Sequence, residues 1–294
     1  MRVSAATPAQ QEKAAVAMAL AEEIESLCSR HDHVSFPLMS RPTAALPSIP
    51  STKSTLTTHL KAARAGVPWH DFKGRRQAKK AAEARATLDR RALMTAAELE
   101  RRNQQEDLDA FWERLCDNDP DTVLPFVQRA FEDNKDAAAI VGIDGDEAYV
   151  VVAAPSESVV PDRMPGVTPT GRPSIKKMPA KERAALHQEA VAGTLVITAM
   201  ETLAVAPALA SVKIAAVDRT HPGSLLWNVR VERSRLESCR RRADTSVGLL
   251  DCAADENDVR LVGAAKRLGA LDPERLGWSE LMNALVHSSE GSWS

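Results

Sequence analysis

Residues 138–153 read AAIVGIDGDEAYVVVA, two apolar runs rich in β-branched residues on either side of Asp144-Gly145. Aspartate and glycine accept the positive φ that tight β-turns require, so this stretch predicts a hairpin with strands at Ala138–Ile143 and Glu147–Ala153. The run Ala180–Val205, which has no proline, predicts a long helix. Strand, strand and helix in this order indicate an α+β or α/β domain in the second half of the chain.

Two further strand-like runs follow this helix. They are Val212–Val217 and Leu225–Val231, separated by a turn at His221-Pro222-Gly223. Short closing helices are expected around Arg233–Arg242, Asp258–Leu268 and Trp278–Val286. The sequence therefore predicts a small β-β-α-β-β domain with closing helices over residues 120–294, and this domain is expected to fold without the residues before it.

The first 119 residues predict three further parts. Residues 1–33 are expected to contain an amphipathic helix, because apolar residues recur there at four-residue spacing. Residues 34–58 are rich in Pro, Ser and Thr and predict an extended linker. Residues 59–119 predict a basic helical arm. From Arg75 to Asp119 this arm contains no Gly or Pro, so it could form one helix, or two if Thr95 and Glu98 make a capping box.

The composition argues against a membrane protein and against a chain that attracts polyanions through its overall charge. The net charge is −2 and 27% of residues are charged, so attraction to nucleic acid or an acidic membrane would have to come from local clusters. The apolar stretch Ala190–Ala210 contains Gly193, Glu201 and Pro207, which favours a buried helix over a membrane span. The polar stretch Met1–Gln11 does not resemble a signal peptide. We therefore expect no membrane partner and a cytoplasmic location.

The cysteines and histidines form no recognised metal or redox motif. The four cysteines are Cys28, Cys116, Cys239 and Cys252. They lie far apart without a C-x-x-C pair and are expected to be reduced thiols. Cys28 with His31 and His33 has a spacing that can bind zinc, but no second pair of ligands lies close in sequence. The sequence therefore predicts no metal and no cofactor.

The arm carries a concentration of positive charge. Between Lys53 and Arg91 it holds eleven Lys or Arg residues and three acids. Four of the cations fall at i, i+1, i+4 and i+5, which places them on one face of a helix: Arg75, Arg76, Lys79 and Lys80. Such a face can follow phosphates, and Trp69 and Phe72 lie beside it as candidate stacking groups. The alternative is an ordinary solvated helix face.

A second candidate anion site precedes the long helix. Arg172, Ser174, Lys176 and Lys177 lie just before the helix start at Ala180. A helix N-terminus presents unpaired N–H groups, so nearby lysines would strengthen its attraction for an anion. The alternative is that these lysines are solvated. Farther along, Glu201 is either exposed or a partly buried acid that needs a cation.

A hydrolytic function is the alternative from a different class. A nuclease of the restriction-endonuclease type needs acids near the hairpin and a nearby acid-x-Lys to hold Mg²⁺. Asp144, Asp146 and Glu147 supply acids, although acids also occur in turns for conformational reasons. No lysine stands at the required spacing from Glu157. The sequence leaves open whether the protein is an enzyme.

Several motifs resemble those of a family of uncharacterised bacterial proteins. They are Leu20–Leu27 with His31, the stretch from Val159-Val160-Pro161 to Lys176-Lys177-Met178-Pro179, and Gly193, Glu201, Pro207 and Leu271-Asp272-Pro273. Members of this family often carry a small N-terminal β domain, which is expected to be absent here. The resemblance implies an α/β C-terminal domain behind a helical arm, and it implies no activity.

These observations together predict a non-enzymatic interaction protein. We expect it to bind an anionic partner, with nucleic acid the best candidate, through the basic arm and the Lys176-Lys177 loop. A protein partner or a second copy of the chain could also bind the arm, although its heptad pattern is too irregular for a long coiled coil.

Overall fold

The computed structural model describes residues 8–49, 51–169, 171–221 and 223–281. By their contacts, the residues divide into two units. We call residues Met1–Met39 with Leu115–Ser294 the sheet unit, and residues Ser40–Arg114 the arm unit. This division differs from the four predicted ranges, because the N-terminal residues group with the sheet rather than forming a part of their own.

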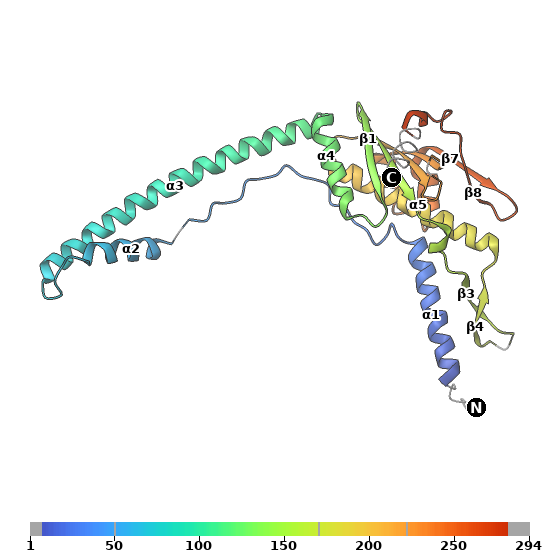
Figure 1. Ribbon diagram of the computed structural model, residues 1–294, viewed down its shortest axis with the longest axis horizontal. Helices are drawn as coiled ribbons and strands as arrows, with labels where there is room; N and C mark the ends of the chain where they lie inside the picture. Colours follow the sequence, from blue (N-terminus) through green and yellow to red (C-terminus); the bar gives the residue numbers. More distant parts are fainter. Residues whose placement is uncertain (1–7, 50, 170, 222, 282–294) are drawn as a thin grey trace, which may run out of the picture. The chain divides into compact units, whose positions relative to one another are not determined.

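The sheet unit is built on a mixed β-sheet, as Figure 1 shows. Its six described strands lie in the order β1 (Ala138–Asp144), β2 (Glu147–Ala154), β5 (Ser211–Asp218), β6 (Leu225–Glu232), β7 (Ala254–Val262) and β8 (Arg267–Gly269). Only β2 and β5 pair in parallel. Helix α5 (Ala180–Val205) connects these two strands, as a parallel crossover requires. The α+β class and the predicted β-β-α-β-β core are confirmed.

Helix α5 covers one face of the sheet and forms the main core with it. Its Leu195 is fully buried, as are Val150 of β2 and Ile214 of β5. Trp227 of β6 is 2% exposed, and its indole Nε1 donates to Asn257 Oδ1 at 2.7 Å. The stretch Ala190–Ala210 is therefore apolar because it is enclosed by protein. No helix in the described part of the chain is long and apolar enough to cross a membrane.

The opposite face of the sheet carries a smaller core. Trp278 packs there against Val151, Ala215 and Leu225, and its indole Nε1 donates to Asn228 Oδ1 at 2.8 Å. The Asn228 amide in turn donates to Asp258 of β7 at 2.9 Å. The segment after β8 is thus held on the sheet by both apolar contacts and buried hydrogen bonds.

Strands β7 and β8 correct one predicted helix. The expected helix at Asp258–Leu268 is wrong, because this segment supplies the antiparallel partner for the edge of β6. Gly263 and Lys266, both with positive φ, make the tight turn between the two strands. A helix here would leave the backbone groups of β6 unpaired. The expected helix at Trp278–Val286 lies partly outside the described residues.

Helix α1 (Pro8–Cys28) and the segment after it belong to the sheet unit. The His31 side chain is fully buried, and its Nδ1 lies 2.9 Å from Ser246 Oγ in hydrogen-bond contact. The backbone N–H of Met39 donates to the Ala204 carbonyl of α5 at 2.9 Å. The predicted linker therefore begins as a fixed segment along α5. Of the three residues Cys28, His31 and His33, the central one, His31, packs in the core of the sheet unit.

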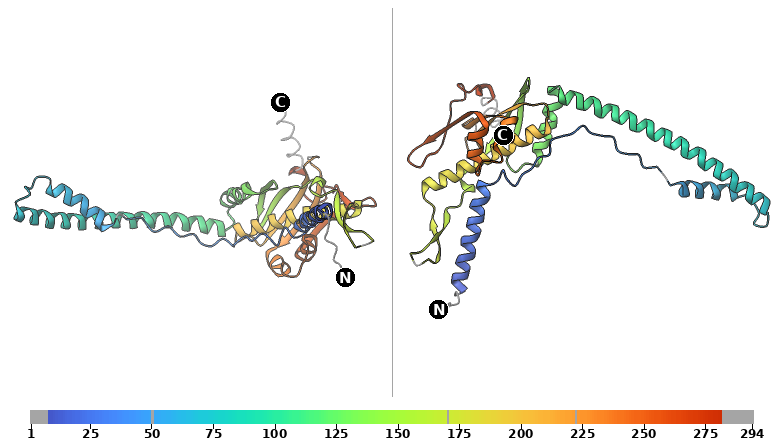
Figure 2. Two further views of the ribbon diagram at one scale, coloured as in Figure 1. Left: turned by 90° about the horizontal axis from the view of Figure 1, so that it is seen from below. Right: turned by 180° about the vertical axis from the view of Figure 1, so that it is seen from behind.

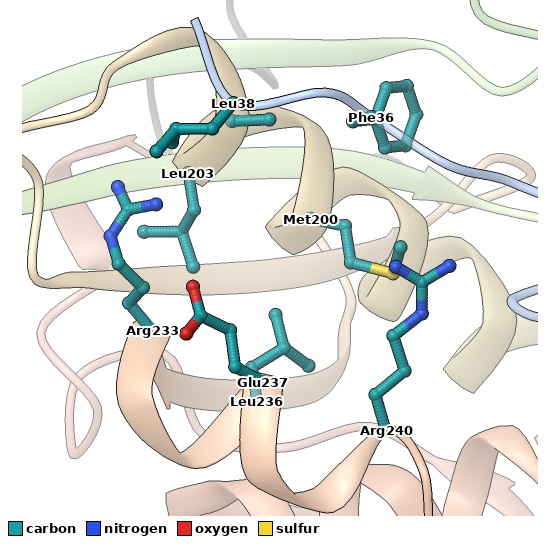
Figure 3. Close-up of a pocket in the computed structure, with 9 residues that line it drawn as sticks. Phe36, Leu38, Met200, Leu203, Arg233, Leu236, Glu237 and Arg240 are labelled. Carbon is teal, nitrogen blue, oxygen red and sulfur yellow. The ribbon is translucent and has the colours of Figure 1, made fainter.

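Figure 3 shows where this segment closes a small hollow of about 110 Å³. Phe36 and Leu38 lie on one side, over Met200 and Leu203 of α5. Helix α6 (Arg233–Cys239) lies on the other side. Arg233 is held there by hydrogen bonds to the carbonyls of Leu209 and Ala206. The end of α5 is thereby covered from both directions.

A disulfide links α6 to helix α7 (Ser246–Ala253). It joins Cys239 and Cys252, so the expectation of four reduced thiols is wrong for these two residues. The two helices pack against each other across a short connection. This places the two cysteines, which are 13 positions apart in sequence, at a Cα–Cα distance of 5.9 Å, which a disulfide can span. Cys28 and Cys116 are free.

The remaining elements of the sheet unit connect these parts. They are α4 (Pro120–Ala130), the 3₁₀ turns η1 (Phe131–Asp133) and η2 (Glu157–Val159), and the hairpin of β3 (Arg163–Val167) with β4 (Pro173–Lys177). Helix α1 contacts both strands of this hairpin. The Lys176-Lys177 segment, expected to be a loop, is therefore a strand of a two-stranded ribbon.

The arm unit consists of α2 (Thr52–Arg64), most of α3 (Phe72–Cys116) and an extended stretch before α2. Helix α3 is continuous, and Thr95 does not start a second helix because its hydroxyl donates to the Arg91 carbonyl one turn earlier. Gln105 of α3 binds the extended stretch, accepting from the Ala44 N–H and donating to the Pro42 carbonyl. The first part of the predicted linker is extended, as expected, and Gln105 holds it along α3. The prediction is wrong for Thr52–Thr58, which belong to α2 because Ser51 caps that helix at its start.

Candidate nucleic-acid interface

The tip of the arm unit is the turn between α2 and α3. Asp71 caps α3, since its Oδ1 accepts from the Gly74 N–H at 2.9 Å. A Cβ at position 74 would lie 2.3 Å from Asp71 Oδ2, so only glycine leaves room for this cap. Beside the cap, the side chains of Trp69 and Phe72 are 75% and 78% exposed. Two large aromatic groups therefore stand in solvent at one turn.

The four candidate cations lie on the first turns of α3. Arg76, Lys79 and Lys80 are exposed, and Arg75 is half-buried with its guanidinium donating to the Trp69 carbonyl at 3.4 Å. The ammonium of Lys79 lies 3.8 Å from Glu83. Among the described residues, this is the one ion pair that any of the eleven arm cations makes. Most of these cations therefore have no ion-pair partner in the part of the chain that the structure describes.

The other side of α3 packs on α2, which lies alongside it in Figures 1 and 2. Ala82 and Ala86, one turn apart, are 1% and 4% exposed. His59 of α2 lies 2.7 Å from Asp89 of α3. Alanine at the contact lets two helices approach closely and leaves the longer basic side chains on the outer surface.

The side chains of the second candidate anion site lie on opposite faces of one strand. Ser174, Lys176 and Lys177 belong to β4, and Arg172 precedes it. Successive strand residues point to opposite faces, so Ser174 and Lys176 share one face and Lys177 lies on the other. A Cβ at Gly166 of β3 would lie 3.1 Å from Ser174 Oγ and 3.4 Å from Lys176 Cδ, which places both side chains over that glycine. The N-terminus of α5 receives no side-chain cap.

The acids of the β1–β2 turn do not converge on a metal site. Glu147 forms an ion pair with Arg230, accepts from Ser211 at 3.0 Å and accepts from Tyr149 at 3.1 Å. Lys213, on the neighbouring strand, pairs with Glu256 at 3.0 Å. Within the described ranges, no group of three or more His, Cys, Asp or Glu side chains could hold a metal ion. Nothing in this region adds support to the nuclease alternative.

Glu201 lies on the buried face of α5. It is 6% exposed, and its carboxylate accepts a hydrogen bond from the Asn134 amide. Burial raises the pKa of this carboxyl above its usual value, and the neighbouring Asp133 raises the pKa further, while the bond from Asn134 opposes the shift. The cation that the sequence led us to expect beside Glu201 is replaced by an amide.

The raised pKa of Glu201 predicts a pH-dependent stability. The folded chain holds the proton more tightly than the unfolded chain, so stability is lost as pH rises above 4.5 through the folded pKa. Glu201→Gln keeps the shape and the acceptor for Asn134 but cannot ionise. We expect the stability difference between Glu201→Gln and the wild type to grow over this pH range and then level off, as measured by urea unfolding. A difference that is constant from pH 4 to 8 would contradict the assignment.

No family model, curated protein or solved structure matches the chain. The resemblance to a family of uncharacterised bacterial proteins accordingly stays a prediction.

Proposed function

We propose that the arm unit binds nucleic acid through its phosphates. The observation that carries the proposal is the set of exposed cations on α2 and α3 around the aromatic tip. Nine of the eleven arm cations are exposed: Lys53, Lys61, Arg64, Lys73, Arg76, Lys79, Lys80, Arg85 and Arg91. With three acids in the same range, the segment carries an excess of eight positive charges, although the whole chain is slightly acidic. A local field of this kind attracts polyanions without any base-specific contact.

The aromatic tip favours single-stranded over double-stranded nucleic acid. Unpaired bases stack on exposed aromatic rings, and each stacked base contributes about 1–3 kcal/mol to binding. Trp69 and Phe72 are available for this because neither ring is enclosed by the arm. The ribbon of β3 and β4 supplies a secondary contact in this proposal, with Lys176 and Ser174 on one face as the phosphate ligands.

The proposed location is the cytoplasm, where nucleic acid is present. One observation argues against this location. The chain contains the Cys239–Cys252 disulfide, and disulfides are more common in proteins of oxidising compartments.

A second copy of the chain is the second candidate partner of the arm. Leu88 and Leu99 of α3 are 63% and 60% exposed. Eleven residues separate them, which at 3.6 residues per turn puts them within about 20° of each other on the helix surface. Two exposed leucines on one side of a helix can contribute to pairing with a second copy, although Thr95 lies between them. The cations of the arm tip lie at other positions of α3, so the two kinds of binding can be measured separately.

The test of the proposed function is the salt dependence of binding. We expect the full chain to bind a fluorescein-labelled oligonucleotide with affinity that falls steeply with salt and depends little on sequence. Replacing Arg75, Arg76, Lys79 and Lys80 together by Gln should flatten the slope of log K against log salt by up to about 2.8 on single-stranded DNA, since each lost contact contributes about 0.7 there. Fluorescence anisotropy between 50 and 200 mM salt measures this.

A matched control separates local contacts from net charge. Replacing Lys181, Arg219, Arg241 and Arg242 by Gln removes the same charge from exposed positions of the sheet unit. This variant should retain the wild-type slope. Equal slopes for the wild type and the arm variant would refute the proposal, as would an equal loss in both variants.

A further inference from the structure

The sheet unit contains a cleft that is independent of the arm. Its volume is about 850 Å³, and it lies between the last turns of α1, the segment after α1, residues 134–136 and the middle of α5. Pockets for small molecules usually measure about 300–1,000 Å³. The cleft is therefore large enough for a small organic ligand.

The walls of the cleft are mainly apolar. They are formed by Leu27, Val34 and Phe36 on the N-terminal side and by Pro155, Val159 and Ile197 on the side of the sheet and α5. Such walls favour a ligand with an apolar body, because its burial removes hydrocarbon surface from water.

Three polar side chains that hydrogen-bond to one another, Arg30, Asp136 and Thr194, form one end of the cleft. The Arg30 guanidinium donates to Asp136 Oδ2 at 3.0 Å and to Thr194 Oγ1 at 3.3 Å. Thr194 also donates to Asp136 at 2.9 Å, so the three side chains hold one another in place. These two bonds use two of the five N–H donors of Arg30. The guanidinium is 22% exposed and keeps donors for a ligand while its charge is balanced by Asp136.

Thr198 presents an unused hydroxyl to the same cleft. It lies on α5 one turn after Thr194, and the residue is only 3% exposed. Among the described residues its hydroxyl has no hydrogen-bond partner. The oxygen is not one of the fully buried atoms without a partner, so it is open to water in the cleft and can exchange that water for a polar atom of a ligand.

Lys135 provides the unbalanced charge. It lines the cleft beside Asn134, and in the described part of the chain it makes no ion pair. Glu23, the other acid of the lining, lies on α1 and likewise makes no ion pair among the described residues. With Arg30 balanced by Asp136, Lys135 is the cation of the lining that is left for a ligand.

From this arrangement we infer that the cleft binds a small amphipathic carboxylate. The carboxylate accepts hydrogen bonds from Lys135, Arg30 and the Thr198 hydroxyl, and the hydrocarbon body lies between the apolar walls. A single negative charge can pair with Lys135, the cation of the lining that makes no ion pair among the described residues. The site is separate from the nucleic-acid interface and does not depend on it.

Octanoate is the probe for this inference, compared with octanol and octylamine, which have the same chain length and a neutral or positive head. With the full chain, octanoate is expected to raise the melting temperature and to give a measurable Kd by isothermal titration calorimetry, while octylamine does not bind at the same concentrations. Lys135→Gln should weaken octanoate binding about fivefold through the loss of a charge-assisted contact. Thr198→Val should also weaken it.

The controls use other exposed charges of the sheet unit. Glu23→Gln should leave octanoate binding unchanged or strengthen it, and Lys177→Gln should have no effect. Both positions and Lys135 are exposed, so these variants remain informative even if Thr198→Val does not fold. Wild-type affinity in Lys135→Gln, or equal binding of octanoate and octylamine, would overturn the inference. The arm variant should bind octanoate normally.

Discussion

A chain that begins at residue 40 is expected to be less stable than the full chain by at least about 3 kcal/mol, because three buried partners are lost and each costs about 1 kcal/mol or more. The deletion removes His31 from Ser246, Arg30 from Asp136 and the Met39 N–H from the Ala204 carbonyl. It also uncovers the apolar end of α5 that Figure 3 shows under Phe36 and Leu38. The sequence predicts that residues 120–294 fold without the residues before them, and these contacts lead us to expect that such a fragment is less stable than the full chain.

Urea unfolding of the two chains measures this loss. His31→Ala in the full chain should cost about 1–3 kcal/mol, since it removes the hydrogen bond to Ser246 and empties the volume of a fully buried side chain. Met18→Ala on the exposed side of α1 is the matched control and should stay within about 0.5 kcal/mol of the wild type. If the shortened chain unfolded at the same urea concentration as the full chain, the N-terminal segment would contribute no net stability.

Reducing the Cys239–Cys252 disulfide is expected to destabilise the sheet unit by about 3 kcal/mol, the effect of opening a loop of this length in the unfolded chain. The measurement is the midpoint of urea unfolding with and without a reductant. Cys239→Ser with Cys252→Ser should behave like the reduced wild type and should not respond to the reductant.

Cys116→Ser serves as the control, because Cys116 is free and exposed. It should keep both the wild-type midpoint and the response to the reductant. A wild-type midpoint that is indifferent to the reductant would mean that the bond contributes nothing to stability.

The elements with strong local signals were predictable. The turn at Asp144-Gly145, the hairpin around it and the helix Ala180–Val205 all occur as expected, and Gly145 has the positive φ of 60° that the turn requires. These features depend on residues close together in sequence, so local patterns contain the information.

The features that depend on distant partners were not predictable. The ribbon of β3 and β4 contains Pro165 and begins its second strand at Pro173, both of which disfavour a strand prediction. The buried position of His31 is set by Ser246, and the disulfide by the packing of α6 on α7. For His31 the deciding contact lies far outside the local sequence window, whereas in the ribbon the prolines conceal a pairing between neighbouring segments.

The candidate sites divide in the same way. The charge of the arm can be counted in the sequence, whereas the exposure of Trp69 and Phe72 follows from the cap between Asp71 and Gly74. The cleft gave no sequence signal at all, because Arg30, Lys135 and Thr198 come from three separate segments. The feature of the sequence that comes nearest to indicating the cleft is the pair of threonines, Thr194 and Thr198, one turn apart on an apolar helix.

The contact between His31 and Ser246 also determines when, during synthesis of the chain, the N-terminal segment can pack. The two residues are 215 positions apart, with the whole arm unit between them. At about 5–20 residues per second, His31 leaves the ribosome roughly 10–40 s before its partner is made. During that interval the apolar side of α1 has no sheet to pack against. This side of α1 therefore stays exposed on the nascent chain until the sheet unit has been synthesised, and a fast-folding arm cannot shorten the delay.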